Sequence, residues 1–78
     1  MIMQKFSIRL STIEDVRNFV NTVSKYDVDV DLSTGRYVVD AKSLMGIFSL
    51  DLLKPIDLTV HSDDAQDLIA ELKSFMID

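Results

Sequence analysis

Hydrophobic and polar residues alternate along four short segments of the chain. A period of two places successive side chains on opposite faces of an extended backbone, so each segment predicts a strand with one buried and one wet face. The predicted strands cover residues 5–10, 27–32, 37–41 and 56–61. Between the second and third strands, Ser33-Thr34-Gly35 predicts a turn, because Gly35 can adopt the positive φ that a tight hairpin requires.

Two helices are predicted between these strands. Ser11, followed three residues later by Glu14, has the spacing of a capping box, which predicts a helix that ends near Lys25. Apolar residues follow this cap at helical spacing, which supports the assignment. Ser43 is the expected N-cap of a second, short helix that runs through Leu50.

A last helix is predicted after the fourth strand, with Ser62 or Asp63 as its cap. Its apolar stripe consists of Ala65, Leu68, Ile69, Leu72, Phe75 and Met76. The predicted order is strand, helix, strand, strand, helix, strand, helix. Because every strand alternates, this order favours one α+β domain over residues 1–78, with a four-stranded antiparallel sheet and three helices on one face.

Composition excludes several classes of function. The 78 residues carry a formal net charge of −5, and the eight Lys and Arg residues are scattered, which argues against a nucleic-acid partner. The chain has no Cys, which excludes disulfides, thiolate metal sites and a cysteine nucleophile. No apolar run reaches the ~20 residues that cross a bilayer, and the N-terminus has no signal-peptide layout. We therefore expect a cytoplasmic protein with no membrane partner.

One segment carries a motif with a known counterpart. Residues 41–50 read Ala-Lys-Ser-Leu-Met-Gly-Ile-Phe-Ser-Leu. This resembles the Lys-Ser-(Ile/Leu)-Met-Gly-(Val/Leu)-Met-Ser-Leu segment of the HPr family, the phosphocarrier proteins of the phosphoenolpyruvate:sugar phosphotransferase system. Phe19-Val20 and Lys25-Tyr26 are also similar to the family's first helix and its exit. The resemblance extends from about residue 5 to residue 76 and implies an open-faced β-sandwich.

The sequence departs from this family between the first strand and the first helix. Family members carry a Gly-Leu-His-Ala-Arg-Pro-like loop there, whose His takes a phosphoryl group from phosphoenolpyruvate through the first enzyme of the system. Counting back from Phe19 places Thr12 at the His position, Glu14 at the Arg position and Asp15 at the Pro position. A Thr hydroxyl is a poor nucleophile without a base, and a carboxylate repels phosphate where a guanidinium would clamp it. We therefore predict neither phosphocarrier nor enzyme activity.

The resemblance implies a regulatory site at Ser43. In many family members from Gram-positive bacteria, the matching serine is phosphorylated by an ATP-dependent kinase, and the phosphoprotein binds a transcription factor in carbon catabolite control. A phosphate at the start of the short helix would meet free backbone N–H groups. A plain N-cap role explains Ser43 equally well from position alone.

A partner-docking patch is implied beside that serine. Leu44, Met45 and Phe48 match positions that form the family's exposed apolar patch, and helical spacing assigns Ile47 and Leu50 to the core instead. The expected partners are proteins of the phosphotransferase and catabolite-control network: a kinase, a transcription factor or a phosphotransferase enzyme. We expect a monomer until such a partner binds.

His61 is the only histidine, and it is expected to face solvent near Arg9 or Lys5. Without an evident orienting group, it is interpreted as a surface residue and not as a relocated phosphoacceptor. Three alternatives stay open: a small oligomerisation or ligand-binding domain, an active phosphocarrier with a non-standard acceptor, and a minor enzyme that uses an Asp or His61.

The second predicted strand carries alternating aspartates, and carboxylates are common calcium ligands. Asp27, Asp29 and Asp31 lack the loop glycine and the distal glutamate of an EF-hand. A solvated acidic face is the simpler interpretation. No metal or other cofactor is therefore predicted.

Overall fold

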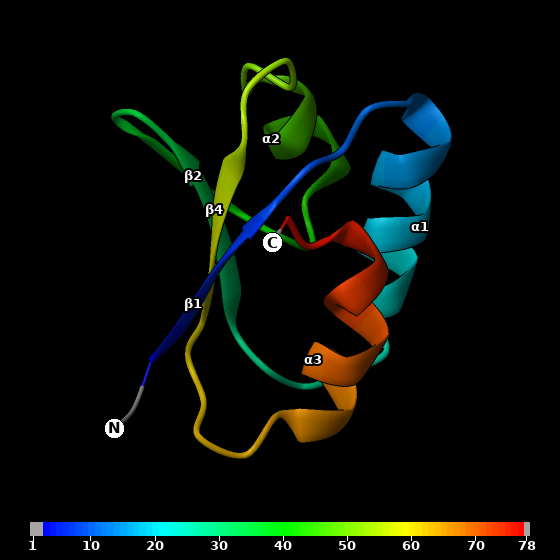
Figure 1. Cartoon of the computed structure of the whole chain (residues 1–78), viewed down its shortest axis with the longest axis vertical. Coiled ribbons are helices and arrows are strands. Elements are labelled where there is room, and N and C mark those ends of the chain that lie inside the picture. Colours follow the sequence, from blue (N-terminus) through cyan, green and yellow to red (C-terminus); the bar gives the residue numbers. More distant parts are fainter. Residues whose placement is uncertain (1–2, 78) are drawn as a thin grey trace.

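The computed structural model describes residues 3–77. One antiparallel sheet has the strand order β1-β4-β2-β3, made of β1 (Gln4–Ile8), β2 (Val30–Thr34), β3 (Tyr37–Asp40) and β4 (Ile56–Val60). One face of this sheet carries α1 (Ile13–Ser24), α2 (Leu44–Phe48) and α3 (Gln66–Leu72), which continues into a short 3-10 turn, η1 (Lys73–Phe75) (Figure 1). The predicted order of elements and the α+β architecture are confirmed.

The core lies between the sheet and the helices. On the helix side of the sheet, Leu58 of β4 lies between Phe6 of β1 and Leu32 of β2 in register. Phe19 of α1 is fully buried and meets the ring of Phe75 edge to face, with the centroids 5.5 Å apart. The buried hydrophobic residues are Ile8, Leu10, Val16, Phe19, Val23, Val30, Leu32, Ala41, Ile47, Leu50, Ile56, Leu58, Val60, Ala65, Leu68 and Leu72. Their burial confirms the alternation along the strands.

The first helix begins one residue later than the sequence predicts. Its N-cap is Thr12, not Ser11, and the capping box is completed by Asp15, not Glu14. The reason is the reach of the Asp15 carboxylate, whose Oδ2 accepts from the backbone N–H groups of both Ser11 and Thr12 at 3.0 and 3.1 Å. A box built on Thr12 therefore satisfies an additional backbone donor.

The last helix also begins later than predicted. Neither Ser62 nor Asp63 caps it, since the N-cap is Ala65, which makes no side-chain cap hydrogen bond. Ser62 instead accepts from the Asp64 N–H at 3.1 Å within the preceding turn. Ala65 is almost fully buried, so the start of the helix packs against the core.

The hairpin between β2 and β3 turns at Gly35-Arg36, so Ser33 and Thr34 belong to the strand and not to the turn. Gly35 has a φ of 58°, which agrees with the predicted need for glycine at this turn. The short α2 helix ends at Phe48, two residues before the predicted Leu50. Within the part of the chain that the structure describes, no helix is long and apolar enough to cross a membrane.

Candidate functional site

The start of α2 is fixed by a compact set of hydrogen bonds around Ser43. Its Oγ accepts from the Gly46 N–H at 3.1 Å, which makes Ser43 the N-cap, as predicted. Asp40 holds the preceding turn, because its carboxylate accepts from the Lys42 N–H at 2.9 Å and its carbonyl from the Ser43 N–H at 3.0 Å. Gly46 packs closely against this cap, since a Cβ there would lie 3.1 Å from Ser43 Oγ and 3.2 Å from Val39 Cβ, so a larger residue would shift these neighbours by a few tenths of an ångström. The Ser43 side chain is half-buried.

The α2 patch, defined as Leu44, Met45 and Phe48, faces solvent. These side chains are 37%, 80% and 41% exposed, respectively. Ile47 is fully buried and Leu50 is 6% exposed, which agrees with their assignment to the core. The short helix therefore presents three apolar side chains directly beside Ser43.

A shallow groove runs between α2 and α1 and continues this surface. It is lined by Arg17, Val20, Asn21 and Leu44. Ile13, one turn before Arg17 on the same helix face, is 66% exposed. The sequence interpretation missed this groove, although the spacing of residues 13, 17 and 20 places them on one helix face.

The position assigned to the family histidine holds a closed capping box. Thr12 Oγ1 accepts from the Asp15 N–H at 3.0 Å, while Asp15 accepts from the backbone of Thr12 and Ser11. Glu14 adds a second carboxylate in the first turn. A helix N-terminus ordinarily offers N–H donors and a favourable dipole to an anion. Here Thr12 Oγ1 takes the Asp15 N–H, and the Asp15 and Glu14 carboxylates place negative charge where an anion would bind.

His61 lies among carboxylates, and Lys5 is on the neighbouring strand, as expected, opposite Thr59 in the β1–β4 register. Arg9 follows Ile8, which pairs with Ile56 at the other end of β4. The ring Nε2 of His61 lies 2.6 Å from Asp31 Oδ2, and its backbone N–H donates to the Asp29 carbonyl at 2.9 Å. The position follows from strand order, because β4 lies between β1 and β2 and the chain after β4 pairs with the start of β2. Asp31 is an orienting group that the sequence interpretation missed. The surrounding hollow is lined by Asp29, Val30, Asp31, Asp40 and His61.

The acidic residues of β2 do not gather into a metal site. Across residues 3–77, no group of three or more His, Asp or Glu side chains is arranged to hold a metal ion. Asp31 instead faces Asp40 across the β2–β3 ladder and pairs with His61.

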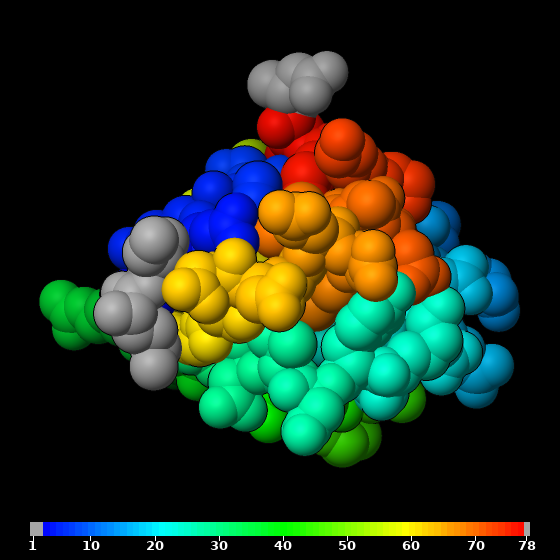
Figure 2. Space-filling view, turned by 90° about the horizontal axis from the view of Figure 1, so that it is seen from below, coloured from blue at the N-terminus to red at the C-terminus, as the bar shows by residue number. Residues whose placement is uncertain are grey.

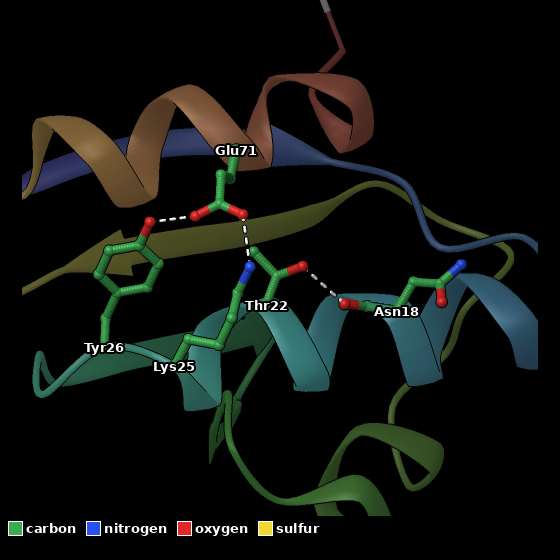
Figure 3. A network of polar contacts seen from close by, with 5 residues as sticks. All are labelled: Asn18, Thr22, Lys25, Tyr26 and Glu71. Atoms are coloured by element: carbon green, nitrogen blue, oxygen red, sulfur yellow. Dashed lines mark hydrogen bonds and ion pairs between the residues drawn. The ribbon is translucent and has the colours of Figure 1, made fainter.

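A polar network joins the end of α1 to α3 (Figure 3), and Lys42 connects it to the start of α2. Lys25 and Tyr26 both point toward Glu71, with Lys25 Nζ 2.6 Å from Glu71 Oε1 and the Tyr26 hydroxyl donating to Oε2. The hydrogen bond to Glu71 raises the pKa of Tyr26 to about 12. The Lys25 and Tyr26 hydrogen bonds lower the pKa of Glu71. Lys42 Nζ donates to the Tyr26 carbonyl at 2.9 Å, which ties this network to the residue before Ser43.

The fold and these sites define a small open-faced β-sandwich that presents an exposed apolar helix next to a half-buried serine. A family model described as the PTS HPr component phosphorylation site matches residues 16–78 of the chain. The matched stretch begins at Val16, so the junction with Thr12, Glu14 and Asp15 lies outside it. The chain belongs to the HPr family of the phosphotransferase system.

Two solved structures share this fold. HPr-C-His from Thermoanaerobacter tengcongensis is 28% identical, with a TM-score of 0.74 over 95% of this chain and 89% of that chain. A phosphocarrier protein HPr from Bacillus anthracis str. Ames is 22% identical, with a TM-score of 0.75 over 99% of this chain and 100% of that chain. HPr is a phosphocarrier protein and not an enzyme, so family membership agrees with the prediction that this chain is not an enzyme.

Proposed function

We propose that this HPr-family protein does not carry phosphate on a histidine and acts as a regulatory or docking partner in the cytoplasm. The observation that carries this proposal is the closed capping box at Thr12. A phosphocarrier needs a nucleophile and an anion-holding environment at one place. Thr12 offers an alcohol whose oxygen accepts a backbone hydrogen bond, with the carboxylates of Glu14 and Asp15 beside it.

The proposed docking surface is the α2 patch together with the groove against α1. Met45 and Phe48 are large apolar side chains that stay exposed at a helix tied to the rest of the fold by the Ser43 cap and the Lys42 bond. Exposed Met and Phe side chains suit adaptable protein recognition. The partners proposed are proteins of the phosphotransferase and catabolite-control network. Ser43 is the proposed site at which an ATP-dependent kinase regulates this binding.

The first experiment tests for histidine phosphotransfer. The protein is incubated with phosphoenolpyruvate and the first phosphotransferase enzyme, with a histidine-containing HPr as the positive control. We expect no acid-labile phosphate on this protein, because neither Thr12 nor its surroundings support a phosphoramidate. Acid-labile phosphate that disappears in a His61→Asn variant would replace this proposal with a phosphocarrier that uses a non-standard acceptor.

The second experiment tests Ser43. With the HPr kinase and ATP, we expect one acid-stable phosphate, which the Ser43→Ala variant loses. Ser49→Ala is the matched control, because Ser49 is exposed at the end of the same helix and should leave incorporation unchanged. If wild-type protein incorporates no phosphate, Ser43 is a structural cap only.

A further inference from the structure

The two edge strands of the sheet, β1 and β3, differ in whether another segment of the chain covers their outer side. The β1 edge is covered by the end of the chain, since the Arg9 N–H donates to the Phe75 carbonyl and the Ile77 N–H to the Ser7 carbonyl, both at 2.9 Å. Ile8 also forms an isolated antiparallel bridge with Met76. The β3 edge has no neighbouring strand in the described chain, because β3 is the last strand of the sheet. The turn of the hairpin that carries it projects from the body of the molecule (Figure 1 and Figure 2).

The first residues of the β3 edge are apolar and exposed, and its protection consists of its short length and Asp40. Tyr37 is 70% exposed and Val38 is 65% exposed. Natural edge strands commonly carry a lysine, a proline or a bulge that blocks pairing with another chain. None of these interrupts residues 37–40, which read Tyr-Val-Val-Asp and pair residue by residue with β2.

The backbone geometry identifies which residues can pair outward. The Ala41 N–H donates to the Val30 carbonyl at 2.9 Å, so the backbone of Ala41 faces β2. Alternate residues of an antiparallel strand direct their N–H and C=O groups to opposite sides. The backbone of Val38 and the N–H of Asp40 therefore point away from β2. The Asp40 carbonyl is already bonded to the Ser43 N–H.

The sequence around this edge is complementary to itself in charge. In an antiparallel pair with a two-fold axis at Val38, residue 36 of one copy lies opposite residue 40 of the other. Arg36 then faces Asp40 of the second copy at both ends of the pairing. Within one copy, Asp40 faces Asp31 across the ladder, which is an unfavourable like-charge pair. A guanidinium from a second copy would offset that repulsion.

We propose that the occupant of the β3 edge is a second copy of this chain, paired antiparallel about Val38 into a continuous eight-stranded sheet. Two Val38 side chains meet at the axis, and the two Arg36–Asp40 pairs set the register. Strands this short make a small interface, so the dimer is weak and depends on concentration. The monomer expected from the sequence then describes only dilute protein. This proposal is independent of phosphorylation at Ser43.

Sedimentation velocity of the full chain between about 10 μM and about 1 mM tests the proposal, and the dimer fraction is expected to rise across this range. Arg36→Asp places a carboxylate opposite each Asp40, and Asp40→Arg places a guanidinium group opposite each Arg36. Each variant alone is expected to remain monomeric at the highest concentration. Mixed in equal amounts, the two variants restore opposite charges at both ends, and we expect heterodimers.

Val38→Lys provides an independent variant, because it places two like charges at the axis without altering the Asp40 turn. Ser7→Lys is the matched control, since it adds the same charge at an exposed position on the covered β1 edge. Circular dichroism verifies that each variant is folded. Wild-type protein that stays monomeric throughout overturns the proposal. Association that survives Val38→Lys, or charge variants that pair with themselves as readily as with each other, also overturns it.

Discussion

The helices α1 and α2 both begin at a hydroxyl side chain, yet the surroundings of the two caps are opposite. Thr12 is enclosed by the Asp15 carboxylate, and the first turn of α1 carries two acids. Ser43 caps a helix whose first turn has no acid and whose next two residues are exposed and apolar. The α1 start therefore satisfies its own hydrogen bonds, whereas the α2 start leaves apolar side chains exposed, where we propose that a partner binds. The neighbours of a cap, and not the cap itself, decide which of these roles a helix start can take.

The largest expected effect comes from removing the anchor of α1. Phe19 is fully buried against Phe75, so Phe19→Ala should lower the free energy of unfolding by about 3–5 kcal/mol. Phe48→Ala, on the exposed α2 patch, should have a clearly smaller effect. Urea unfolding followed by circular dichroism measures both. Equal decreases in the free energy of unfolding would mean that the α2 patch is part of the core. That result would contradict the proposed difference between the buried face of α1 and the exposed face of α2.

Most of the fold was predictable because local patterns and tertiary packing agree. The alternation of residues 56–60 matches β4 as observed, and Gly35 lies at the hairpin turn. The errors occur where a choice depends on packing or on exact side-chain reach. The sequence predicted a capping box of Ser11 with Glu14, whereas the backbone geometry forms it from Thr12 and Asp15.

The candidate site was predictable only where a motif covers it. Residues 43–48 were identified from the motif, and their exposure agrees with helical spacing. The Tyr26–Glu71 contact joins residues 45 positions apart, and the His61–Asp31 contact joins residues 30 positions apart. A local sequence pattern cannot predict contacts between residues so far apart in the sequence. The pairing of β1 with β4 agrees with the prediction, whereas the pairing of β4 with β2, which brings Asp31 to His61, was not predicted.

A smaller loss of stability is expected from removing the N-cap of α1. Thr12→Ala should lower the free energy of unfolding by about 1 kcal/mol, the usual effect of losing an N-cap. Adding Asp15→Ala should have less than its separate effect, because both residues act in one box. Thr12→Ala should also leave kinase incorporation at Ser43 unchanged, which the phosphorylation assay measures. Loss of incorporation in a folded Thr12→Ala protein would connect the two helix starts and contradict their separation.

The contacts of Glu71 with Lys25 and Tyr26 should make the free energy of unfolding depend modestly on pH. The effect is modest because the Lys25 and Glu71 side chains are 59% and 38% exposed. The pKa of Glu71 is lowered from 4.5, so its contribution is present above that pH and lost as the carboxylate is protonated in acid. The pKa of Tyr26 is raised from 10.0 to about 12, so its contribution is present below pH 10 and lost toward pH 12.

Thermal unfolding of wild type and Glu71→Gln across this range checks both signs. The stability difference should be flat between the two limits and should narrow in acid and in alkali. Tyr26→Phe is the matched variant, and it should remove the alkaline change while keeping the acidic one. A difference that grows in acid would mean that Glu71 does not act as an ionised acceptor.

The smallest effect on stability is expected at the most exposed residue of the α2 patch. Met45 is 80% exposed, so Met45→Ser should change the free energy of unfolding by no more than about 0.5 kcal/mol. Binding to phosphotransferase-system proteins, measured by calorimetry, should nevertheless weaken, because Met45 supplies apolar contact area to the partner. Leu53→Ser is the matched control, since Leu53 is 88% exposed but lies beyond α2. If Leu53→Ser weakens binding and Met45→Ser does not, the partner surface lies in the loop after α2, and this helix is exposed without being a docking site.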